Sequence, residues 1–532
     1  MIVSAHGEQA LIRPQAGEAL TQGRMGPGAD LLFVNPPGPD DDTWIRCQHR
    51  TGQRAPDGTV WPQTALAQLA AMFPDRPVSV IDANARRLDW AEFGAQVQRA
   101  RPRWYVTLLS GPTLQSDLQG VTLAKRAGAR TVALGLLATP LAHSLLERYP
   151  ALDYVLCGEP ELTLRELVDT VDNTALQRTR PIERLFGPAD EAPWPQTLGA
   201  VRGLAWRHEG QVIINASRPL IPRLDDLPLP LHRLLPLGKY SAPAVEAPSA
   251  VVVTGRGCLG NCCFCPKHIV YQDTLRVRSP ESIVAELIEL QRLGVHNVTL
   301  QANLFTACRD QVADLCRLIG AEGLALSWSC TSRPDTVDEE LVRLMARAGC
   351  RRITWAIESG AERILQRSGK GSQAAAQAEQ ALAWSRAAGI HNWGSFLLGL
   401  PGETEESIRR TIALAVALRL ERVSFDLAVP HPGTPFYRQA AASGWLRQGV
   451  SVIEGDPSGP AVVEYPRLKA AQLELWRERA YCEWAMSPGS LWGHLHILKQ
   501  ARAGRLMLGR QPLTAAEENA LLHSRPLLFA SE

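Results

Sequence analysis

Four cysteines lie within eight positions in the segment GCLGNCCFCP at residues 257–266. Cys258, Cys262 and Cys265 have the spacing C-x3-C-x2-C, and Cys263 directly follows the second of them. Three thiolates in one loop can bind three irons of a 4Fe–4S cluster and leave the fourth iron without a protein ligand. The spacing therefore predicts an iron–sulfur loop, in which we interpret Cys263 as a thiol that binds no iron.

Zinc is the alternative occupant of this loop. Cys262 and Cys265, together with His268 or another cysteine, could bind a zinc ion. Structural zinc sites usually include a second cysteine pair at a distance, and we find no such pair in this sequence. We therefore favour iron and sulfide.

The composition is that of a globular protein with several domains. A length of 532 residues suggests roughly two to four domains. Lys and Arg total 56 and Asp and Glu total 54, so the charge balance gives no reason to expect a nucleic acid or a membrane surface as partner. We find no signal peptide and no apolar run long enough to cross a bilayer, and we expect a reducing cytoplasm. There a cysteine cluster usually serves metal or redox chemistry.

Short apolar runs alternate with helical patterns in the first third of the chain. Residues 1–29 are Gly-rich and aperiodic, and we expect them to be a disordered lead-in. The predicted strands cover residues 30–37, 78–83, 104–110, 131–135 and 153–160. With helices between them, they predict a doubly wound parallel sheet over residues 30–173. Such a sheet binds its ligand at the C-terminal ends of its strands.

The alternation resumes after a proline-rich stretch. Residues 174–249 are interpreted as a linker with a hairpin at 203–214. Six further strands are predicted at residues 250–255, 297–301, 325–330, 352–357, 392–399 and 422–429. They indicate a partial (β/α)6 barrel of the TIM type over residues 250–440, with its chemistry at the C-terminal ends of the strands. Residues 441–532 are predicted to form a helical C-terminal region.

Short motifs follow the strands of this barrel. They are CLGNCCFC at 258–265, TSRPD at 331–335, AIESG at 356–360, GLPGE at 399–403 and VPHPGTPFY at 429–437. Together they resemble the motifs of the radical S-adenosylmethionine (radical SAM) enzymes. The resemblance implies that the open iron binds SAM, and that one electron from the cluster cleaves SAM to a 5′-deoxyadenosyl radical.

The same resemblance implies roles for individual residues. The cluster ligands are Cys258, Cys262 and Cys265. The residues of the SAM site are Phe264, Arg333, Glu358, Ser359 and Gly399. Phe264 matches an aromatic position beside the adenine, and Glu358 a hydrogen-bond partner of the ribose or amino group. The alternative for Glu358 is a structural partnership with Arg333.

A doubly wound domain in front of such a barrel resembles the cobalamin-binding subclass of these enzymes, and the resemblance covers residues 30–440. It implies that the strand ends bind cobalamin through Asn35, Pro37, Ser110, Gly111, Thr113, Gly135, Leu136, Gly158 and Glu159. Residues 30–170 lack the D-x-H-x-x-G motif whose histidine ligates cobalt, and we interpret His143 as a surface residue. Cobalt would then lack a protein histidine, with Leu136, Leu137 and Ser110 near its lower face. An empty, degenerate domain is the alternative.

The function implied by this subclass is C-methylation of an unactivated carbon through methylcobalamin and a 5′-deoxyadenosyl radical. The anaerobic magnesium-protoporphyrin monomethyl ester cyclase shares the architecture, so oxidative cyclisation of a tetrapyrrole is an alternative. A non-catalytic sensor that holds cobalamin or a cluster is another, although a sensor would not need the full set of motifs. The partners implied are a small-molecule substrate and an electron donor such as flavodoxin or ferredoxin, with no nucleic acid and no membrane span.

Overall fold

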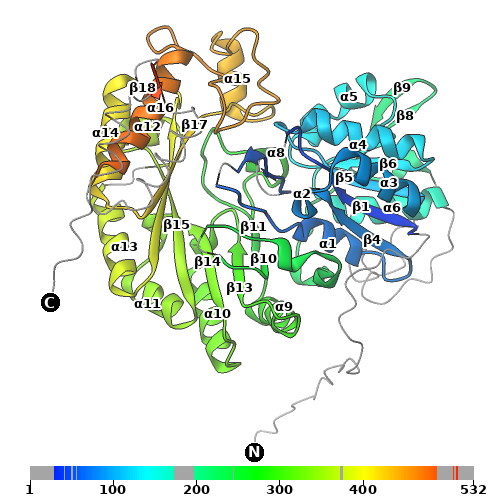
Figure 1. Cartoon of the computed structure of the whole chain (residues 1–532), viewed down its shortest axis with the longest axis horizontal. Helices are drawn as coiled ribbons and strands as arrows, with labels where there is room; N and C mark the ends of the chain where they lie inside the picture. The colour runs from blue at the N-terminus through cyan, green and yellow to red at the C-terminus, as the bar shows by residue number, and fades with distance from the viewer. Residues whose placement is uncertain are drawn as a thin grey trace, which may run out of the picture.

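The computed structural model describes residues 29–40, 42–48, 52–55, 57–172, 197–243, 245–371 and 375–487, with the short pairs 507–508 and 511–512. The lead-in predicted for residues 1–29 lies outside the described residues, apart from Ala29. Two lobes stand side by side in Figure 1, the first drawn in blue to cyan and the second in green to yellow. The orange segment near the C-terminus lies on the second lobe.

The first lobe is built on a sheet that contains seven strands among the described residues, in the order β4-β1-β5-β6-β7-β8-β9. The strands are β1 (Leu31–Asn35), β4 (Val78–Asp82), β5 (Trp104–Leu108), β6 (Arg130–Leu134), β7 (Tyr154–Leu156), β8 (Leu204–His208) and β9 (Gln211–Ile214). The first five named in the order are parallel, which confirms the doubly wound sheet. Their order places the topological switch point between β1 and β5, where such folds bind ligands.

Helices cover both faces of this sheet. They are α1 (Thr64–Ala71), α2 (Ala83–Arg86), α3 (Trp90–Ala100), α4 (Leu114–Arg126), α5 (Ala138–Arg148) and α6 (Pro160–Asp172). Leucines of α1 and α6 pack with one face of the strands, and apolar residues of α3, α4 and α5 pack with the other. Strands β1 and β5 are therefore buried along their whole length, as the apolar runs LLFVN and WYVTL require.

The hairpin that we assigned to the linker belongs to the first sheet. Strand β8 pairs antiparallel with β7, and β9 pairs with β8. Leu204 and Ala205 are fully buried in the two cores of this lobe. The hairpin covers the edge of β7, which would otherwise expose unpaired backbone groups. Strands β8 and β9 therefore belong to the first lobe and not to a separate linker.

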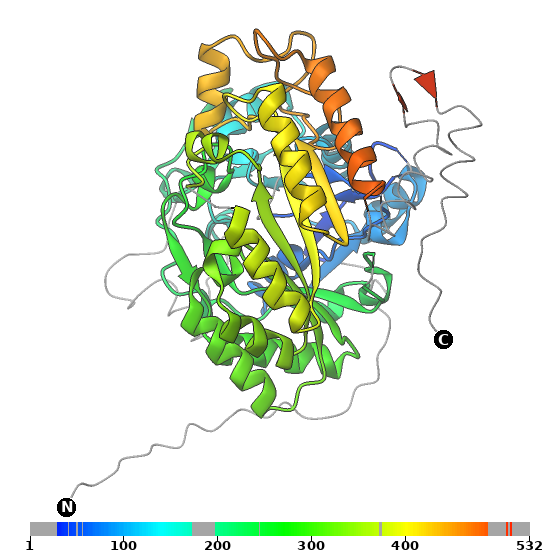
Figure 2. The ribbon, with the colours of Figure 1, turned by 90° about the vertical axis from the view of Figure 1, so that its left-hand side faces the viewer.

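The second sheet contains six parallel strands in the described part of the chain, in the order β10-β13-β14-β15-β16-β17. They are β10 (Ser249–Val253), β13 (Asn297–Gln301), β14 (Ser327–Ser332), β15 (Cys350–Glu358), β16 (His391–Leu398) and β17 (Arg422–Leu427). The helices outside them are α9 (Pro280–Arg292), α10 (Arg309–Ala321), α11 (Glu339–Arg347), α12 (Glu362–Arg367), α13 (Ala375–Ala387) and α14 (Glu405–Ala417). All six strands were predicted, and Figure 2 shows the helices that cover the outside of the curved sheet.

The segment between β1 and α1 lies between the two lobes, as Figure 1 shows in dark blue. It includes the short strands β2 (Trp44–Ile45) and β3 (Gln53–Arg54). Val60 forms a β-bridge with Ser241, and Asp57 forms an ion pair with Arg422 on β17. The described residues of this insertion, residues 36–63, therefore contact both sides of the opening of the partial barrel, at Ser241 ahead of β10 and at Arg422 on β17.

The C-terminal region is helical only in part. Helix α15 (Pro435–Ala442) is followed by an irregular stretch and by helix α16 (Ala470–Ala485). The irregular stretch covers the edge of β17, because the Leu427 N–H donates to the Pro457 carbonyl at 2.8 Å. Strands β18 (Met507–Leu508) and β19 (Gln511–Pro512) pair beyond α16, and the rest of 488–532 lies outside the described residues. No helix in the described ranges is long and apolar enough to cross a membrane.

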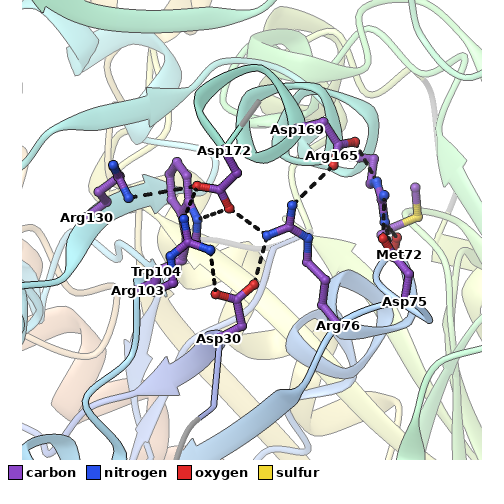
Figure 3. A network of polar contacts seen from close by, with 10 residues as sticks. All are labelled: Asp30, Met72, Asp75, Arg76, Arg103, Trp104, Arg130, Arg165, Asp169 and Asp172. Atoms are coloured by element: carbon purple, nitrogen blue, oxygen red, sulfur yellow. Dashed lines mark hydrogen bonds and ion pairs between the residues drawn. The ribbon is translucent and has the colours of Figure 1, made fainter. Parts of the chain in front are cut away.

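A network of charged residues connects the N-terminal ends of the strands of the first sheet to the C-terminal end of α6 (Figure 3). Arg76 donates to Asp30 at 2.8 Å and to Asp172 at 2.6 Å. Arg103 and the Trp104 indole also donate to Asp172, whose side chain is 1% exposed. Asp172 is the last residue of α6, where the helix dipole disfavours a carboxylate. The arginines supply the compensating charge.

Replacing Asp172 by Ala should lower the free energy of unfolding by about 2 kcal/mol, because the buried Arg76 guanidinium loses Asp172 as a charged hydrogen-bond acceptor and keeps Asp30. Urea unfolding followed by circular dichroism measures the change. The control is Lys125→Gln, which removes an exposed ion pair with Asp153 and should cost about 0.5 kcal/mol. Equal shifts for the two variants would contradict a structural role for the network.

Candidate active site

The cysteine loop is held at both ends by buried polar contacts. It follows β11 (Gly255–Gly257) and precedes α8 (Lys267–Val270). The Gly257 N–H donates to the Asn303 side-chain oxygen at 2.9 Å. The Lys267 ammonium, on a side chain only 1% exposed, donates to the Cys258 carbonyl at 2.7 Å. Both ends of the loop are thus fixed by groups other than the thiols, and within the loop the Gly260 N–H donates to the Cys258 sulfur at 3.3 Å.

Three of the four thiols interact with one another, although they do not converge as the ligands of a single metal ion do. A Cβ atom at Gly260 would lie 3.4 Å from the Cys258 sulfur and 4.0 Å from the Cys262 sulfur, so both thiols face the same space. The Cys265 thiol interacts electrostatically with both of them. Cys263 also interacts electrostatically with Cys262, and its side chain packs against the core of the second lobe. The assignment of Cys258, Cys262 and Cys265 as the ligand set stays a prediction.

The thiols must lose protons before they can bind iron. Burial raises the pKa of the Cys265 thiol to about 12, and burial also raises the pKa of the Cys262 thiol. Lys370 and Arg333 act in the opposite direction on Cys262 and favour its thiolate. Among the described residues, no three His, Cys, Asp or Glu side chains converge as the ligands of one metal ion do.

Glu358 lies at the C-terminal end of β15 in an unusual backbone conformation. Its φ angle is 68°, a left-handed value that costs energy for a residue with a side chain. The strand register shifts beside it. Its carboxylate accepts a hydrogen bond from Lys370 at 2.9 Å, whereas Arg333 is paired with Asp335. The alternative prediction of a Glu358–Arg333 pair is therefore wrong.

Arg333 and Glu358 both lie near the cysteine loop. A Cβ atom at Gly260 would be 3.7 Å from the Arg333 guanidinium, and Arg333 donates to the Lys370 carbonyl at 2.9 Å. Lys370 therefore links Arg333, through its backbone, to Glu358, through its side chain. This places two of the residues predicted for SAM beside the predicted cluster ligands.

The other residues predicted for SAM contact the protein. The Ser359 hydroxyl lies 3.1 Å from the Thr411 hydroxyl of α14. Gly399 has a φ of 88°, and a Cβ atom there would lie 3.3 Å from Leu473 of α16. Phe264 packs at the margin of the core of the second lobe. Their assignment to SAM stays a prediction.

Sequence reasoning did not single out Glu403, the last residue of the GLPGE motif. Its side chain is buried and accepts hydrogen bonds from the Gly399 N–H and the Ser407 hydroxyl. Burial raises the pKa of the Glu403 carboxyl to about 7. The motif glycine and glutamate together form a buried turn that fixes the end of β16.

A buried ion cluster joins the cysteine loop to the first lobe. Arg256 of β11 lies two residues before Cys258 and is 4% exposed. It pairs with Glu159 at 3.0 Å and with Glu161 at 2.6 Å. Arg276 of β12 (Leu275–Val277) also pairs with Glu159, at 2.9 Å. Glu159, predicted to contact cobalamin, has its carboxylate engaged in this cluster.

Other contacts bring the C-terminal ends of both sheets together. Leu136, after β6, forms an apolar cluster with Val270 and Tyr271 at the end of α8. A Cβ atom at Gly433, which follows β17, would lie 3.5 Å from Pro140 of α5. The strand ends of the first lobe therefore face the strand ends that carry the cysteine loop.

The switch point of the first sheet is occupied by Arg46, which sequence reasoning also missed. Its guanidinium donates to Asn35 at 3.0 Å and to Thr113 at 2.9 Å, and it forms an ion pair with Asp117 at 2.9 Å. It also donates to the Pro37 carbonyl. Three residues predicted for cobalamin are thus tied together by one arginine from the insertion.

The remaining strand-end residues line a small apolar pocket or its surroundings. Ser110 and Gly111 line it together with Leu137 and Ile453. The Ser110 hydroxyl is buried without a hydrogen-bond partner among the described residues. Gly135 has a φ of 129° and approaches the Leu109 carbonyl, while a Cβ atom at Gly158 would meet open space. His143 is exposed, as predicted.

The chain is similar to known proteins over most of its length. The sequence profile of the Radical SAM superfamily matches residues 252–415. An uncharacterized methyltransferase of Pyrococcus horikoshii is 30% identical over 393 residues, which cover 73% of this chain and 80% of that protein. The anaerobic magnesium-protoporphyrin IX monomethyl ester cyclase of Cereibacter sphaeroides is 24% identical over 404 residues, 74% of this chain and 62% of the cyclase.

A solved structure has the same two-lobed fold. It is that of the radical S-adenosylmethionine methyltransferase TsrM from Kitasatospora setae, with cobalamin and a 4Fe–4S cluster bound. The TM-score is 0.61 at 18% identity, and the alignment covers 85% of this chain and 82% of that chain. The predicted order of a doubly wound lobe followed by a partial barrel is thereby confirmed as a known fold.

Single replacement of Cys258, Cys262 or Cys265 by Ala should abolish the visible absorbance of the reconstituted cluster, because each change removes one of three thiolate ligands. Iron and acid-labile sulfide per chain provide the measurement. Cys263→Ala is the matched control and should retain the cluster. If Cys263→Ala loses the cluster while Cys262→Ala keeps it, the ligand assignment is wrong.

Replacing Glu403 by Gln should remove a pH dependence of stability. The pKa of Glu403 is raised from 4.5 to about 7, so its proton-linked stabilisation is complete below pH 4.5 and is lost as the pH rises through 7. Relative to Glu403→Gln, the parent protein should lose on the order of 2 kcal/mol of unfolding free energy over this interval. Urea unfolding at pH 5 and pH 8 tests this, and parallel profiles for the two proteins would contradict it.

Proposed function

Because this chain belongs to the radical SAM superfamily, we propose that it is a cobalamin-dependent methyltransferase that methylates an unactivated carbon of a small molecule. The observation that carries the proposal is the meeting of the two sets of strand ends. The Arg256–Glu159 contact at 3.0 Å holds the cysteine loop directly against the ligand-binding edge of the first sheet. Two cofactors bound at the C-terminal ends of the two sets of strands would lie next to each other, between the lobes.

The residues of the second lobe fit a 4Fe–4S cluster with SAM. Cys258, Cys262 and Cys265 would hold the cluster, and the vacant iron would bind SAM. Glu358, fixed by Lys370, would accept hydrogen bonds from the SAM ribose or amino group. When bound, these groups supply the electron and the 5′-deoxyadenosyl radical that removes a hydrogen atom from the substrate, while cobalamin supplies the methyl group.

The residues of the first lobe fit a corrin with amide side chains. The buried Ser110 hydroxyl has no hydrogen-bond partner among the described residues and could bond such an amide. Leu136, Leu137 and Gly111 offer an apolar surface beside it. The relation to TsrM, a structure with cobalamin bound, supports the same assignment. The role of the protein is to position the groups and to exclude water from the radical.

Oxidative cyclisation of a tetrapyrrole is the second candidate function. It is favoured by the similarity to the magnesium-protoporphyrin IX monomethyl ester cyclase over 74% of this chain. The two reactions differ in what SAM becomes. Methyl transfer consumes one SAM as methyl donor and releases S-adenosylhomocysteine, whereas cyclisation does not require that product.

The test is anaerobic reconstitution of the full chain with iron, sulfide and cobalamin, followed by addition of SAM and dithionite. Flavodoxin or ferredoxin, the electron donors that we propose for the cell, would replace dithionite in a second arm. We expect 5′-deoxyadenosine and S-adenosylhomocysteine by mass spectrometry, together with cobalamin retained at about one per chain. Cys262→Ala should produce no 5′-deoxyadenosine, and Cys263→Ala should match the parent protein.

Each product decides one part of the proposal. 5′-Deoxyadenosine without S-adenosylhomocysteine would favour oxidation or cyclisation. An intact cluster that forms neither product would favour a sensor. Loss of cobalamin on gel filtration, with the cluster retained, would indicate an empty first lobe.

A further inference from the structure

In the barrel interior, near the N-terminal ends of the strands, two arginine side chains stack on one tryptophan ring. Arg352 of β15, Trp393 of β16 and Arg422 of β17 occupy positions that alternate with buried residues facing the outer helices. Arg422 is the register partner of Trp393. The two guanidinium carbons lie 4.1 Å and 4.8 Å from the Trp393 ring centre. Both cations therefore point into the interior of the barrel and stack on the same ring.

The carboxylate available there pairs with one of the two cations. Asp57, from the insertion, forms an ion pair with Arg422. Arg352 has no ion pair with any described residue and donates only to neutral oxygens, at 3.2 Å to the Pro243 carbonyl and at 3.1 Å to the Ser329 hydroxyl. Its Nε is buried without a partner among the described residues. The site thus carries one uncompensated positive charge.

This charge is in an unfavourable environment. Burial, and the repulsion by Arg422, lower the pKa of Arg352 to about 10. A guanidinium whose Nε is buried with an unmade hydrogen bond costs free energy until an acceptor binds there. An anion would satisfy both needs at once, because carboxylate and phosphate oxygens match the planar guanidinium.

We propose that Arg352, with Ser329 beside it, binds the anionic group of the substrate, a carboxylate or a phosphate. This inference rests on the proposed function, because it places the substrate inside the barrel whose upper end carries the cysteine loop. Arg352 precedes Glu358 by six positions on β15, which is roughly 20 Å along a strand. The substrate is therefore an elongated molecule whose charged end lies far from the carbon that reacts.

The wall between the two ends suits a polar molecule. One level above the arginines, the inward residues carry hydroxyl groups and are partly exposed; they are Thr331, Thr354, Ser395 and Ser424. The next level consists of Ala356, Leu397 and Asp426. Barrels of the TIM type usually fill this space with branched apolar side chains. Small hydroxyl side chains leave room for a ligand and offer it hydrogen bonds.

Titration calorimetry of the reconstituted full chain with inorganic phosphate, in a buffer free of other oxyanions, tests the site. We expect phosphate to bind the parent protein and to bind Arg352→Gln at least tenfold more weakly. Arg351→Gln is the matched control, because the Arg351 side chain is exposed and donates to the Ala346 carbonyl. It should bind phosphate as the parent does. Acetate, titrated in the same way, shows whether a carboxylate is preferred to a phosphate.

A second variant covers the case in which Arg352→Gln does not fold. Thr354→Glu places a carboxylate on the inward row one level above Arg352, so the protein supplies its own anion. Phosphate binding should be lost and the urea midpoint should not fall. Phosphate bound equally by the parent protein and Thr354→Glu, or not bound by the parent, overturns the proposal.

The phosphate content of the protein as purified from cells distinguishes a permanently bound ion from an anionic group of the substrate. Phosphate released by denaturation at one per chain would identify a resident ion and overturn the assignment to the substrate. Release of less than about one-tenth of a phosphate per chain supports a site that is empty until the substrate binds. None of these measurements requires cleavage of SAM, so a chain that fails the test of the proposed function can still pass this one.

Discussion

A buried arginine between two glutamates holds the cysteine loop against the other lobe. Arg256 lies in β11, two residues before Cys258, and its guanidinium is held by Glu159 and Glu161. Burial opposes its charge, but the two carboxylates raise the pKa of Arg256 well above its ordinary value. Because breaking a buried pair leaves an uncompensated charge, the loop cannot move away from the first sheet cheaply.

The rest of the architecture follows from this constraint. Parallel sheets bind ligands at the C-terminal ends of their strands, and here the ends of two such sheets are fixed face to face. Leu136 against Val270, and Gly433 against Pro140, extend the contact beyond the ion cluster. Radical chemistry needs its reacting groups close and dry. A fixed junction between two ligand-binding edges supplies both conditions.

The sequence predicted the local features and missed those that depend on distant partners. The strands of both sheets and the cysteine loop have strong local patterns, so their existence and order could be read directly. The hairpin at 203–214 was found but placed in the linker, because its pairing with β7 depends on an edge about fifty positions earlier in the chain. Arg46 and Arg352 carry no local signal, since each owes its role to residues brought near by folding. Glu403 lies within the GLPGE motif and its partners Gly399 and Ser407 are four positions away, so a local signal was present but was not assigned to it. Glu358 was found, but its partner Lys370 was not.

The insertion between β1 and α1 precedes the second lobe in the chain but contacts its barrel, so the two lobes depend on each other for a complete structure. It supplies Asp57 to Arg422, and Val60 to Ser241, so part of the barrel wall is encoded ahead of the lobe that uses it. If the first lobes of two relatives were exchanged, the barrel of each would be contacted by an insertion that evolved with a different barrel. Recombination at the apparent lobe boundary would therefore change residues that contact the barrel interior. A functional chimera would have to keep residues 36–63 together with the barrel that they contact.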